Sequence, residues 1–173
     1  MGYTSSNYTD DHTLVYIAHP ISGDIIGNIT KVLAIARQLH VEENVIPLTP
    51  YISYLLYLDD HSEKERMMGV IGDKAQIARA AERIEIFGPK ISTGIKYEAL
   101  FGKQLVKPIT LRNPELINDL GEVLNGYKFT VRPFELKREY MDSVECNLAG
   151  LVNNARWLEK VTRFAQLYDT RRT

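Results

Sequence analysis

The chain has 173 residues, of which 45% are hydrophobic and 25% are charged, and its formal net charge at pH 7 is −1. This length and composition are typical of an average globular protein with one sizeable core, so we expect a single domain. The balanced charge, without a block of like charges, gives no indication of nucleic-acid or anionic-membrane binding. The single cysteine, Cys146, excludes an intramolecular disulfide and any multi-cysteine metal site.

The N-terminal residues are polar and lack the basic start and apolar run of a signal peptide. No apolar stretch approaches the about 18 residues that a membrane-spanning helix needs. We therefore expect a soluble, cytoplasmic protein in which a flexible arm, residues 1–12, precedes one domain over residues 13–173. Cys146 is expected to be a small core residue rather than a nucleophile.

The predicted elements begin with a strand over residues 13–18, whose unbroken apolar character favours a central strand covered on both faces. A turn over residues 19–24 follows. Asn28 is then expected to cap a helix whose apolar residues follow the 3.6-residue period as far as Leu39. Residues 45–48 predict a second, short strand.

A less regular region follows the second strand. Residues 51–58 have helical spacing, and Ser62 with Glu65 has the pattern of a capping box for a helix that ends at about Ala81. Residues 83–87 predict a third strand, residues 93–105 a helix, and residues 107–111 a fourth strand.

The pattern weakens beyond Asn113. We expect a short helix over residues 114–124, a turn at Asn125-Gly126 and a last strand over residues 127–131. A helical extension from about residue 134 has apolar residues at intervals of three and four. So broad an apolar face must cover the sheet or pack on another subunit, and we favour a subunit contact in a homo-oligomer.

The alternation of strands and helices predicts the fold class. We expect a three-layer α/β domain of the Rossmann or flavodoxin type, with a mostly parallel sheet of about five strands and extra C-terminal helices.

The segment between the third strand and the next helix has the clearest chemical pattern. A Gly-Pro turn is followed by Ser92 and Gly94, and Glu98 lies one turn into the helix. A loop at this edge of a parallel sheet offers backbone N–H groups and a helix N-terminus to an anion. Ser92 and Gly94 therefore suit a phosphate or a sugar hydroxyl. The alternative is that Glu98 is an ordinary first-turn glutamate favoured by the helix dipole.

Four motifs, in this order along residues 13–111, resemble the nucleoside 2-deoxyribosyltransferase-like superfamily. The resemblance is strongest to an uncharacterised bacterial and phage branch whose first-strand motif is Y-I-A-x-P. The motifs are Tyr16 to Asp24 with Asn28, Pro47 to Pro50, Leu58 to Asp60, and Ile86 to Gly88 continuing into S-x-G-x-x-x-E with Gly102-Lys103 and Lys107-Pro108.

The resemblance implies a retaining reaction at an N-glycosidic bond. Glu98 would attack the anomeric carbon and expel the base, and water or a second base would resolve the glycosyl-enzyme ester. Tyr16 would orient the nucleophile, and Asp73 is the candidate for the acid that protonates the leaving base. The alternatives are that Tyr16 is a packed aromatic and Asp73 a carboxylate on a helix surface.

The resemblance also bears on the substrate. Serine at the position of Ser92 goes with nucleoside 5′-monophosphates, whereas aspartate goes with free nucleosides. Ser92, the Gly94 backbone and the turn at Ser22-Gly23 could together bind a phosphate, and Lys90 or Lys96 could add charge.

The histidines give a less specific signal. His19 could touch the base or the phosphate, or it could be a structural imidazole bonded to the turn. His12, His40 and His61 lack metal-ligand spacing, so we expect no metal, and we expect no cofactor.

The predicted function is cleavage or transfer of the N-glycosidic bond of a (deoxy)nucleoside or its 5′-monophosphate, with this small molecule as the partner. One alternative is a nucleotide-binding or sensing module without catalysis. Another is cleavage of a nicotinamide dinucleotide, although no G-x-G-x-x-G fingerprint is present. A third is an interaction protein that acts through its C-terminal helices.

Overall fold

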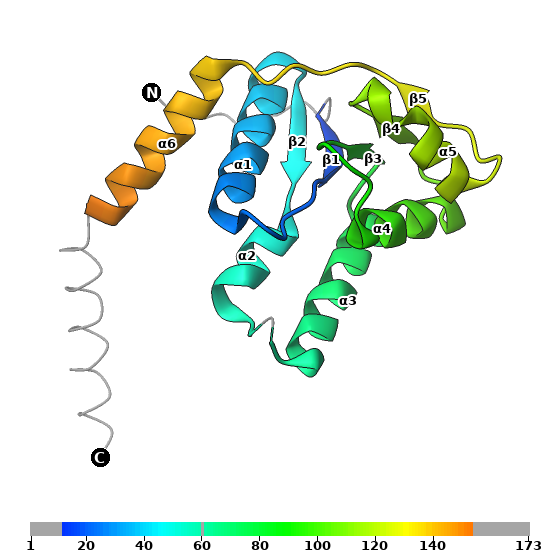
Figure 1. Cartoon of the computed structure of the whole chain (residues 1–173), viewed down its shortest axis with the longest axis horizontal. Coiled ribbons are helices and arrows are strands. Elements are labelled where there is room, and N and C mark those ends of the chain that lie inside the picture. Colours follow the sequence, from blue (N-terminus) through cyan, green and yellow to red (C-terminus); the bar gives the residue numbers. More distant parts are fainter. Residues whose placement is uncertain (1–11, 60, 154–173) are drawn as a thin grey trace, which may run out of the picture.

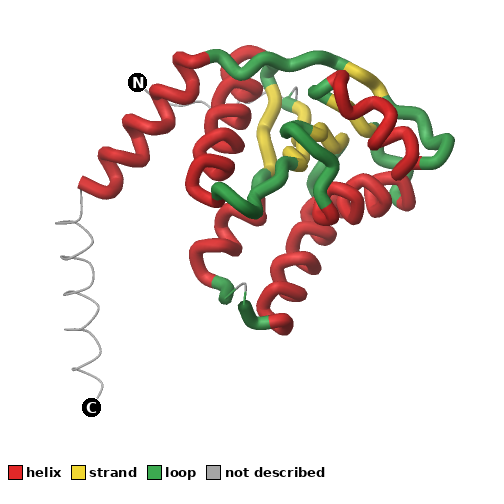
Figure 2. The backbone as a smooth tube through the Cα atoms, in the orientation of Figure 1, coloured by secondary structure: helices red, strands yellow, loops and turns green. Residues whose placement is uncertain are grey.

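The computed structural model describes residues 12–59 and 61–153 (Figures 1 and 2). Its elements alternate between strands and helices, as the sequence predicts. They are β1 (Thr13–Ala18), α1 (Ile25–Glu42), β2 (Val45–Leu48), α2 (Pro50–Tyr57), α3 (Glu63–Arg79), β3 (Arg83–Ile86), α4 (Thr93–Gln104), β4 (Ile109–Leu111), the 3-10 helix η2 (Pro114–Leu116), α5 (Ile117–Leu124), β5 (Thr130–Val131) and α6 (Arg138–Asn153).

The five strands form one sheet in the order β2-β1-β3-β4-β5, and every neighbouring pair is parallel. This is the flavodoxin-type order, so the predicted fold class is confirmed. The connections from β1 and from β3 leave toward opposite sides of the sheet. A crevice therefore opens between the carboxyl ends of these two strands, where ligands bind in folds of this kind.

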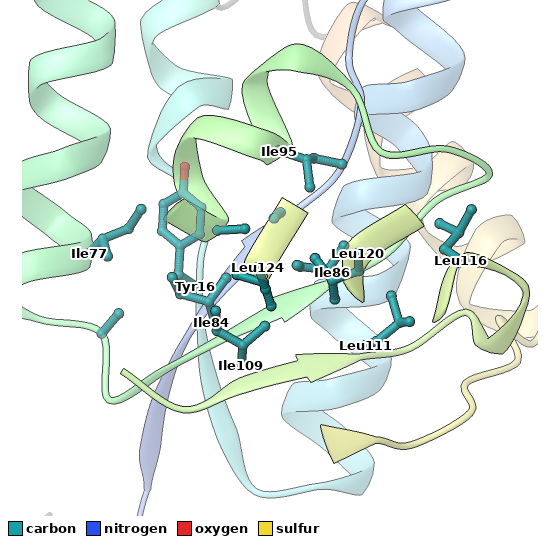
Figure 3. Close-up of a cluster of buried hydrophobic side chains, with 13 residues drawn as sticks. Tyr16, Ile77, Ile84, Ile86, Ile95, Ile109, Leu111, Leu116, Leu120 and Leu124 are labelled. Atoms are coloured by element: carbon teal, nitrogen blue, oxygen red, sulfur yellow. The ribbon is translucent and has the colours of Figure 1, made fainter. Parts of the chain in front are cut away.

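Two apolar clusters cover the two faces of the sheet, and β1 contributes to both. Val15 and Ile17 pack with α1, while Tyr16 and Ala18 pack with α3, α4 and α5. All four are fully buried, as the unbroken apolar run predicts for a central strand. Figure 3 shows the cluster that contains Tyr16. The Tyr16 hydroxyl lies at the end of the ring that points away from β1.

The start of α1 differs from the prediction. Asp24, not Asn28, is the N-cap, and its carboxylate accepts a hydrogen bond from the Gly27 amide at 3.0 Å. Asn28 lies inside the helix and donates from its side chain to the Ile21 carbonyl at 3.1 Å. The helix begins earlier because Gly23, at a φ of +96°, turns the chain sharply enough to put a capping carboxylate at residue 24.

The start of α3 follows half of the predicted capping box. The Ser62 hydroxyl accepts from the Glu65 amide at 3.4 Å, as expected. The Glu65 carboxylate instead accepts from the Asp59 amide at 2.7 Å, so it bonds the preceding turn and not the cap residue. This contact ties the end of the α2 segment to α3.

The C-terminal helix α6 packs along α1 on the outside of the domain (Figure 1). It buries Val144 and packs on another helix rather than on the sheet, and the subunit contact stays a prediction. Cys146 is exposed, so the expectation of a core cysteine is wrong. Residues that are two positions apart in a helix point to nearly opposite sides. A helix that buries position 144 therefore exposes position 146. The N-terminal arm and the helical pattern after residue 153 lie outside the described residues.

None of the helices in the described ranges is long and apolar enough to cross a membrane.

Candidate active site

A cavity of about 740 Å³ opens at the carboxyl ends of β1 and β3. The loops that follow these strands form one side, and α2 and α3 form the other. It is lined by all but one of the predicted site residues, namely His19, Ser22, Gly23, Asp73, Ser92, Gly94 and Glu98. The remaining one, Tyr16, reaches this group from β1 below. Residues from β1, from the loop that follows it, from α3 and from the start of α4 thus meet in one place.

The Tyr16 hydroxyl donates a hydrogen bond to Oε1 of Glu98 at 2.8 Å. Tyr16 is fully buried on the face of β1 that α4 covers, and α4 itself begins at its Ser92 cap. The Tyr51 ring packs edge-on against the Tyr16 ring, with 6.2 Å between the ring centres. The Tyr51 hydroxyl donates a hydrogen bond to the Ile17 carbonyl at 2.8 Å. The tyrosine that positions Glu98 is therefore itself held in place.

Asp73 lies on α3 beside this pair. Its Oδ1 is buried and has no hydrogen-bond partner among the described residues. Asp73 and Glu98 line the same cavity, and the Tyr16 hydroxyl lowers the pKa of both carboxyl groups. Asp73 is thus part of the cavity wall rather than a plain carboxylate on a helix surface.

Burial raises the pKa of both carboxyl groups. The pKa of Glu98 is about 8, because loss of solvent outweighs the hydrogen bond from Tyr16, and the nearby Asp73 charge adds to the rise. Loss of solvent likewise raises the pKa of Asp73, to about 7. Burial and then the Glu98 charge raise the pKa of Tyr16 well above its ordinary value, so Tyr16 stays a hydrogen-bond donor.

The pKa values and the hydrogen bonds point to different carboxyl groups as the one that holds the proton near neutral pH. The pKa values favour protonation of Glu98 first. The hydrogen bond makes Glu98 the acceptor and leaves the buried Asp73 Oδ1 without a donor. We assign the proton to Asp73, because an ionised and unpartnered buried oxygen costs more than a neutral one.

The loops after β1 and β3 approach each other at Gly88. At a φ of +102°, Gly88 lies so close to the first loop that a Cβ there would be 2.6 Å from Cδ of Pro20. Ser92 caps α4 by accepting from the Ile95 amide at 3.3 Å, which leaves its own proton free to donate to a ligand. The cavity therefore has a polar side formed by two glycine-containing loops.

His19 lies at this polar side. It is only 9% exposed, and its Nδ1 lies 2.7 Å from the Pro20 carbonyl oxygen. Burial is the main reason why its pKa is lowered from the ordinary value. The imidazole is thus bonded to the turn and also lines the cavity.

Several cavity residues were missing from the sequence analysis as site residues. The outer wall comes from apolar and charged side chains of α2 and α3. They are Tyr54, Leu55, Leu58, Glu65, Arg66 and Val70. Their helical spacing resembles that of any packed helix, so only the paired positions of α2 and α3 reveal the wall. Of the two lysines considered, Lys90 lines the cavity and Lys96 is not among its lining residues.

Comparison of the sequence with models of protein families identifies the family of this chain. A model described as a domain of unknown function, DUF7768, matches residues 13–112. The chain belongs to the DUF7768 family. The matched segment of this DUF7768 protein contains all eight predicted site residues, whereas β5 and α6 lie beyond it.

A search of curated proteins finds no match. A solved structure that matches comes from work on a 2-deoxyribosyltransferase of the psychrotolerant bacterium Bacillus psychrosaccharolyticus. It is 19% identical, with a TM-score of 0.49, and the match covers 71% of this chain and 100% of that chain.

Proposed function

We propose that this DUF7768 protein cleaves or transfers the N-glycosidic bond of a nucleoside or nucleoside 5′-monophosphate. The reaction proceeds through a covalent glycosyl ester on Glu98. The observation that carries the proposal is the 2.8 Å hydrogen bond from Tyr16 to Glu98, with Asp73 beside it, at a cavity between β1 and β3.

In the first step, a carboxylate oxygen of Glu98 forms a bond to the anomeric carbon while the bond from that carbon to the base nitrogen breaks. The electron pair of the broken bond passes to the base, and Asp73 supplies the proton that neutralises it. The transition state resembles an oxocarbenium ion, so the negative charge of Glu98 also stabilises it. Tyr16 holds the attacking oxygen by its hydrogen bond.

In the second step, water or a second base attacks the anomeric carbon and displaces Glu98 as a carboxylate. The ionised Asp73 accepts the proton that the attacking group loses. Both catalytic groups then return to their starting protonation states. The cycle uses only side chains of this chain.

The two sides of the cavity suit the two ends of such a substrate. Ser22 and Gly23 in the loop after β1, with Ser92 and Gly94 at the start of α4, offer backbone and hydroxyl donors. None of these four residues is a carboxylate, which suits a 5′-phosphate. The wall of α2 and α3 offers aromatic and aliphatic side chains to a base.

A second candidate function is nucleotide binding without turnover. The observation that favours it is the pKa of about 8 for Glu98, since a protonated glutamic acid is not a nucleophile near neutral pH. Both candidates predict binding, and only the first predicts release of a base.

The test is a base-release assay on ribo- and deoxyribonucleosides and their 5′-monophosphates, with and without an acceptor base. Glu98→Ala is assayed in parallel. We expect release from a monophosphate that disappears in the variant, and a glycosylated wild-type protein detected by intact mass spectrometry after rapid quenching. If nothing is cleaved while the same compounds bind, the second candidate holds.

A further inference from the structure

We propose that His19 makes the binding of a phosphate group in this cavity proton-linked, so that one proton is taken up when the phosphate binds. The inference rests on the phosphate-containing substrate class of the proposed function, but not on catalysis.

The position of His19 places it next to both phosphate-binding loops. It directly follows β1 and precedes the Ser22-Gly23 turn. On its other side, a Cβ added to Gly88 would lie 3.5 Å from Cδ2 of His19, so the ring also touches the loop after β3 that leads to Ser92. The imidazole therefore lies between the two loops, and it lines the cavity that they share.

The hydrogen bond to Pro20 decides which ring nitrogen carries the proton. A carbonyl oxygen can only accept, so the Nδ1 at 2.7 Å from it must be the donor. In a neutral imidazole, Nε2 then has a lone pair and no proton. Within the described ranges Nε2 has no hydrogen-bond partner and is not among the atoms sealed from solvent. Neutral His19 thus offers the cavity an acceptor only.

A phosphate dianion also offers only acceptors. The two groups can face each other only if a proton lies between them, either on Nε2 or on a phosphate oxygen. Above the second pKa of a phosphate monoester, about 6, neither group supplies that proton when free, because burial and the Lys31 charge also lower the pKa of His19. The complex must take the proton from solvent. A sugar hydroxyl at the same place would donate to Nε2 without any proton exchange.

Other charged groups around the cavity must be separated from this effect. Lys31 on α1 acts on His19 directly, and Asp24 caps the same helix. Lys90 lies in the loop after β3, and Arg66 with Glu65 lies at the outer part of α3. Asp73 and Glu98 have pKa values of about 7 and about 8, so they can also exchange protons when the cavity fills.

The experiment is isothermal titration of the full chain at pH 8 in two buffers that differ in protonation enthalpy. The probes are inorganic phosphate and 2-deoxyribose 5-phosphate, which contain no base and so undergo no cleavage. 2-Deoxyribose is the control ligand, because it reports proton exchange at Asp73 and Glu98 without a phosphate. His19→Asn is the control variant, because its amide can donate to phosphate without titrating, and His19→Gln repeats the test with a longer amide.

We expect uptake of about one proton per phosphate-containing ligand in the wild type and about none in either variant or with 2-deoxyribose. The wild-type affinity for phosphate should weaken by up to about tenfold per pH unit above pH 8, and that of His19→Asn should stay nearly constant. Sulfate, which does not protonate near neutral pH, should show the same uptake if the proton resides on the imidazole.

Equal proton uptake in the wild type and in His19→Asn would overturn the inference, as would phosphate binding without uptake or no phosphate binding at all. These outcomes are independent of the base-release assay. A protein that takes up the proton but cleaves no nucleotide keeps this inference and loses the glycosidase. A protein that cleaves a nucleotide without linked proton uptake keeps the glycosidase proposal and loses this inference.

Discussion

Partly or fully buried carboxylates occur on both faces of the sheet, and their surroundings differ. On the side of α3 and α4, Glu98 and Asp73 have no ion-pair partner among the described residues. Glu98 accepts a hydrogen bond from Tyr16, and Oδ1 of Asp73 has no partner there. On the side of α1, Glu85 on β3 is 1% exposed and pairs with Arg83 at 2.7 Å and with Arg112 at 3.5 Å.

The arginine at the centre of the second group is enclosed on several sides. Arg112 pairs with Glu43 at 2.6 Å, and its guanidinium lies 5.6 Å from the ring centre of Phe87 and 5.0 Å from that of Phe134. These contacts tie the ends of α1, β3 and β4 to the segment that leads to α6. Glu85 and Glu43 can stay ionised inside the protein because arginine side chains compensate their negative charges.

The comparison separates structure from function by one physical criterion. A buried charge is costly unless it is paired, so a fold keeps an unpaired carboxyl group at the expense of stability. Such groups have strongly shifted pKa values and occur preferentially at functional sites. By this criterion we propose Glu98 and Asp73 as the working site, and Glu43 and Glu85 as residues that stabilise the fold.

The strongest test makes the same substitution on each face. Glu98→Gln should lower base release by roughly 10⁴-fold or more, because an amide cannot form the glycosyl ester, while thermal stability is unchanged or rises. Glu85→Gln should lower the free energy of unfolding by about 3 kcal/mol and leave kcat of the folded protein within about twofold. Base-release assays and urea denaturation measure the two effects. Equal destabilisation by both substitutions would make Glu98 a structural residue.

Removal of the central arginine should affect stability alone. Arg112→Met removes the cation that Glu85 and Glu43 share. Arg83 still pairs with Glu85 and Arg132 with Glu43, so we expect a loss of about 2–3 kcal/mol in the free energy of unfolding. Urea denaturation followed by circular dichroism measures the loss. A triple variant that also carries Glu43→Gln and Glu85→Gln should recover part of it. Unchanged stability of Arg112→Met would contradict the structural role of this group.

Asp73→Asn tests the acid on the other face. We expect kcat to fall by about 10²- to 10³-fold, because the leaving base is no longer protonated. A purine nucleoside methylated at N7 already carries a positive charge, so its cleavage should be nearly unaffected. Comparison of kcat for the two leaving groups measures this directly. Equal losses on both would show that Asp73 positions the substrate and does not protonate the base.

Tyr16→Phe should have a smaller effect on the rate and a characteristic effect on its pH dependence. The hydrogen bond from Tyr16 lowers the pKa of Glu98, so without it that pKa rises further. The rising limb of the profile of kcat/KM against pH should move to higher pH, and the rate at pH 7 should fall by about tenfold. Tyr51→Phe is the matched control, because its hydroxyl donates to a backbone carbonyl. The same shift in both variants would refute the assignment.

The last expected effect is on the pH dependence of stability. The folded pKa values of about 8 for Glu98 and about 7 for Asp73 lie above the ordinary values of 4.5 and 3.8. Their contribution to stability is therefore fully present below about pH 4 and is lost as the pH rises through 7 and 8. Between pH 6 and pH 9 this loss amounts to about 4 kcal/mol, so the unfolding temperature should fall by about 10 °C. Differential scanning calorimetry of the Glu98→Gln, Asp73→Asn double variant should show a flatter profile, and an unchanged slope would exclude these groups as its cause.

Much of the fold could be predicted because its signals are local. The unbroken apolar run at residues 13–18 indicates a strand buried on both faces, and Asn125-Gly126 forms the expected turn, with φ values of 41° and 81°. The loop that leads to Glu98 was recognisable because a strand, a turn and a helix cap follow each other directly in the sequence. The N-cap of α1 was misplaced by four residues, since Asp24 and Asn28 are equally suitable cap residues by type.

The sequence by itself determined the order of strands and helices and which side chains end up at the carboxyl edge of the sheet. It could not show that Asp73 shares a space with Glu98, because α3 and α4 meet only when the sheet is assembled. The difference between paired and unpaired carboxylates was also invisible, since Glu85 and Glu98 have the same side chain. Only the tertiary structure brings Arg112 to Glu85 and leaves Glu98 with a tyrosine hydroxyl, and this proximity decides which carboxylate is paired with a cation and which is not.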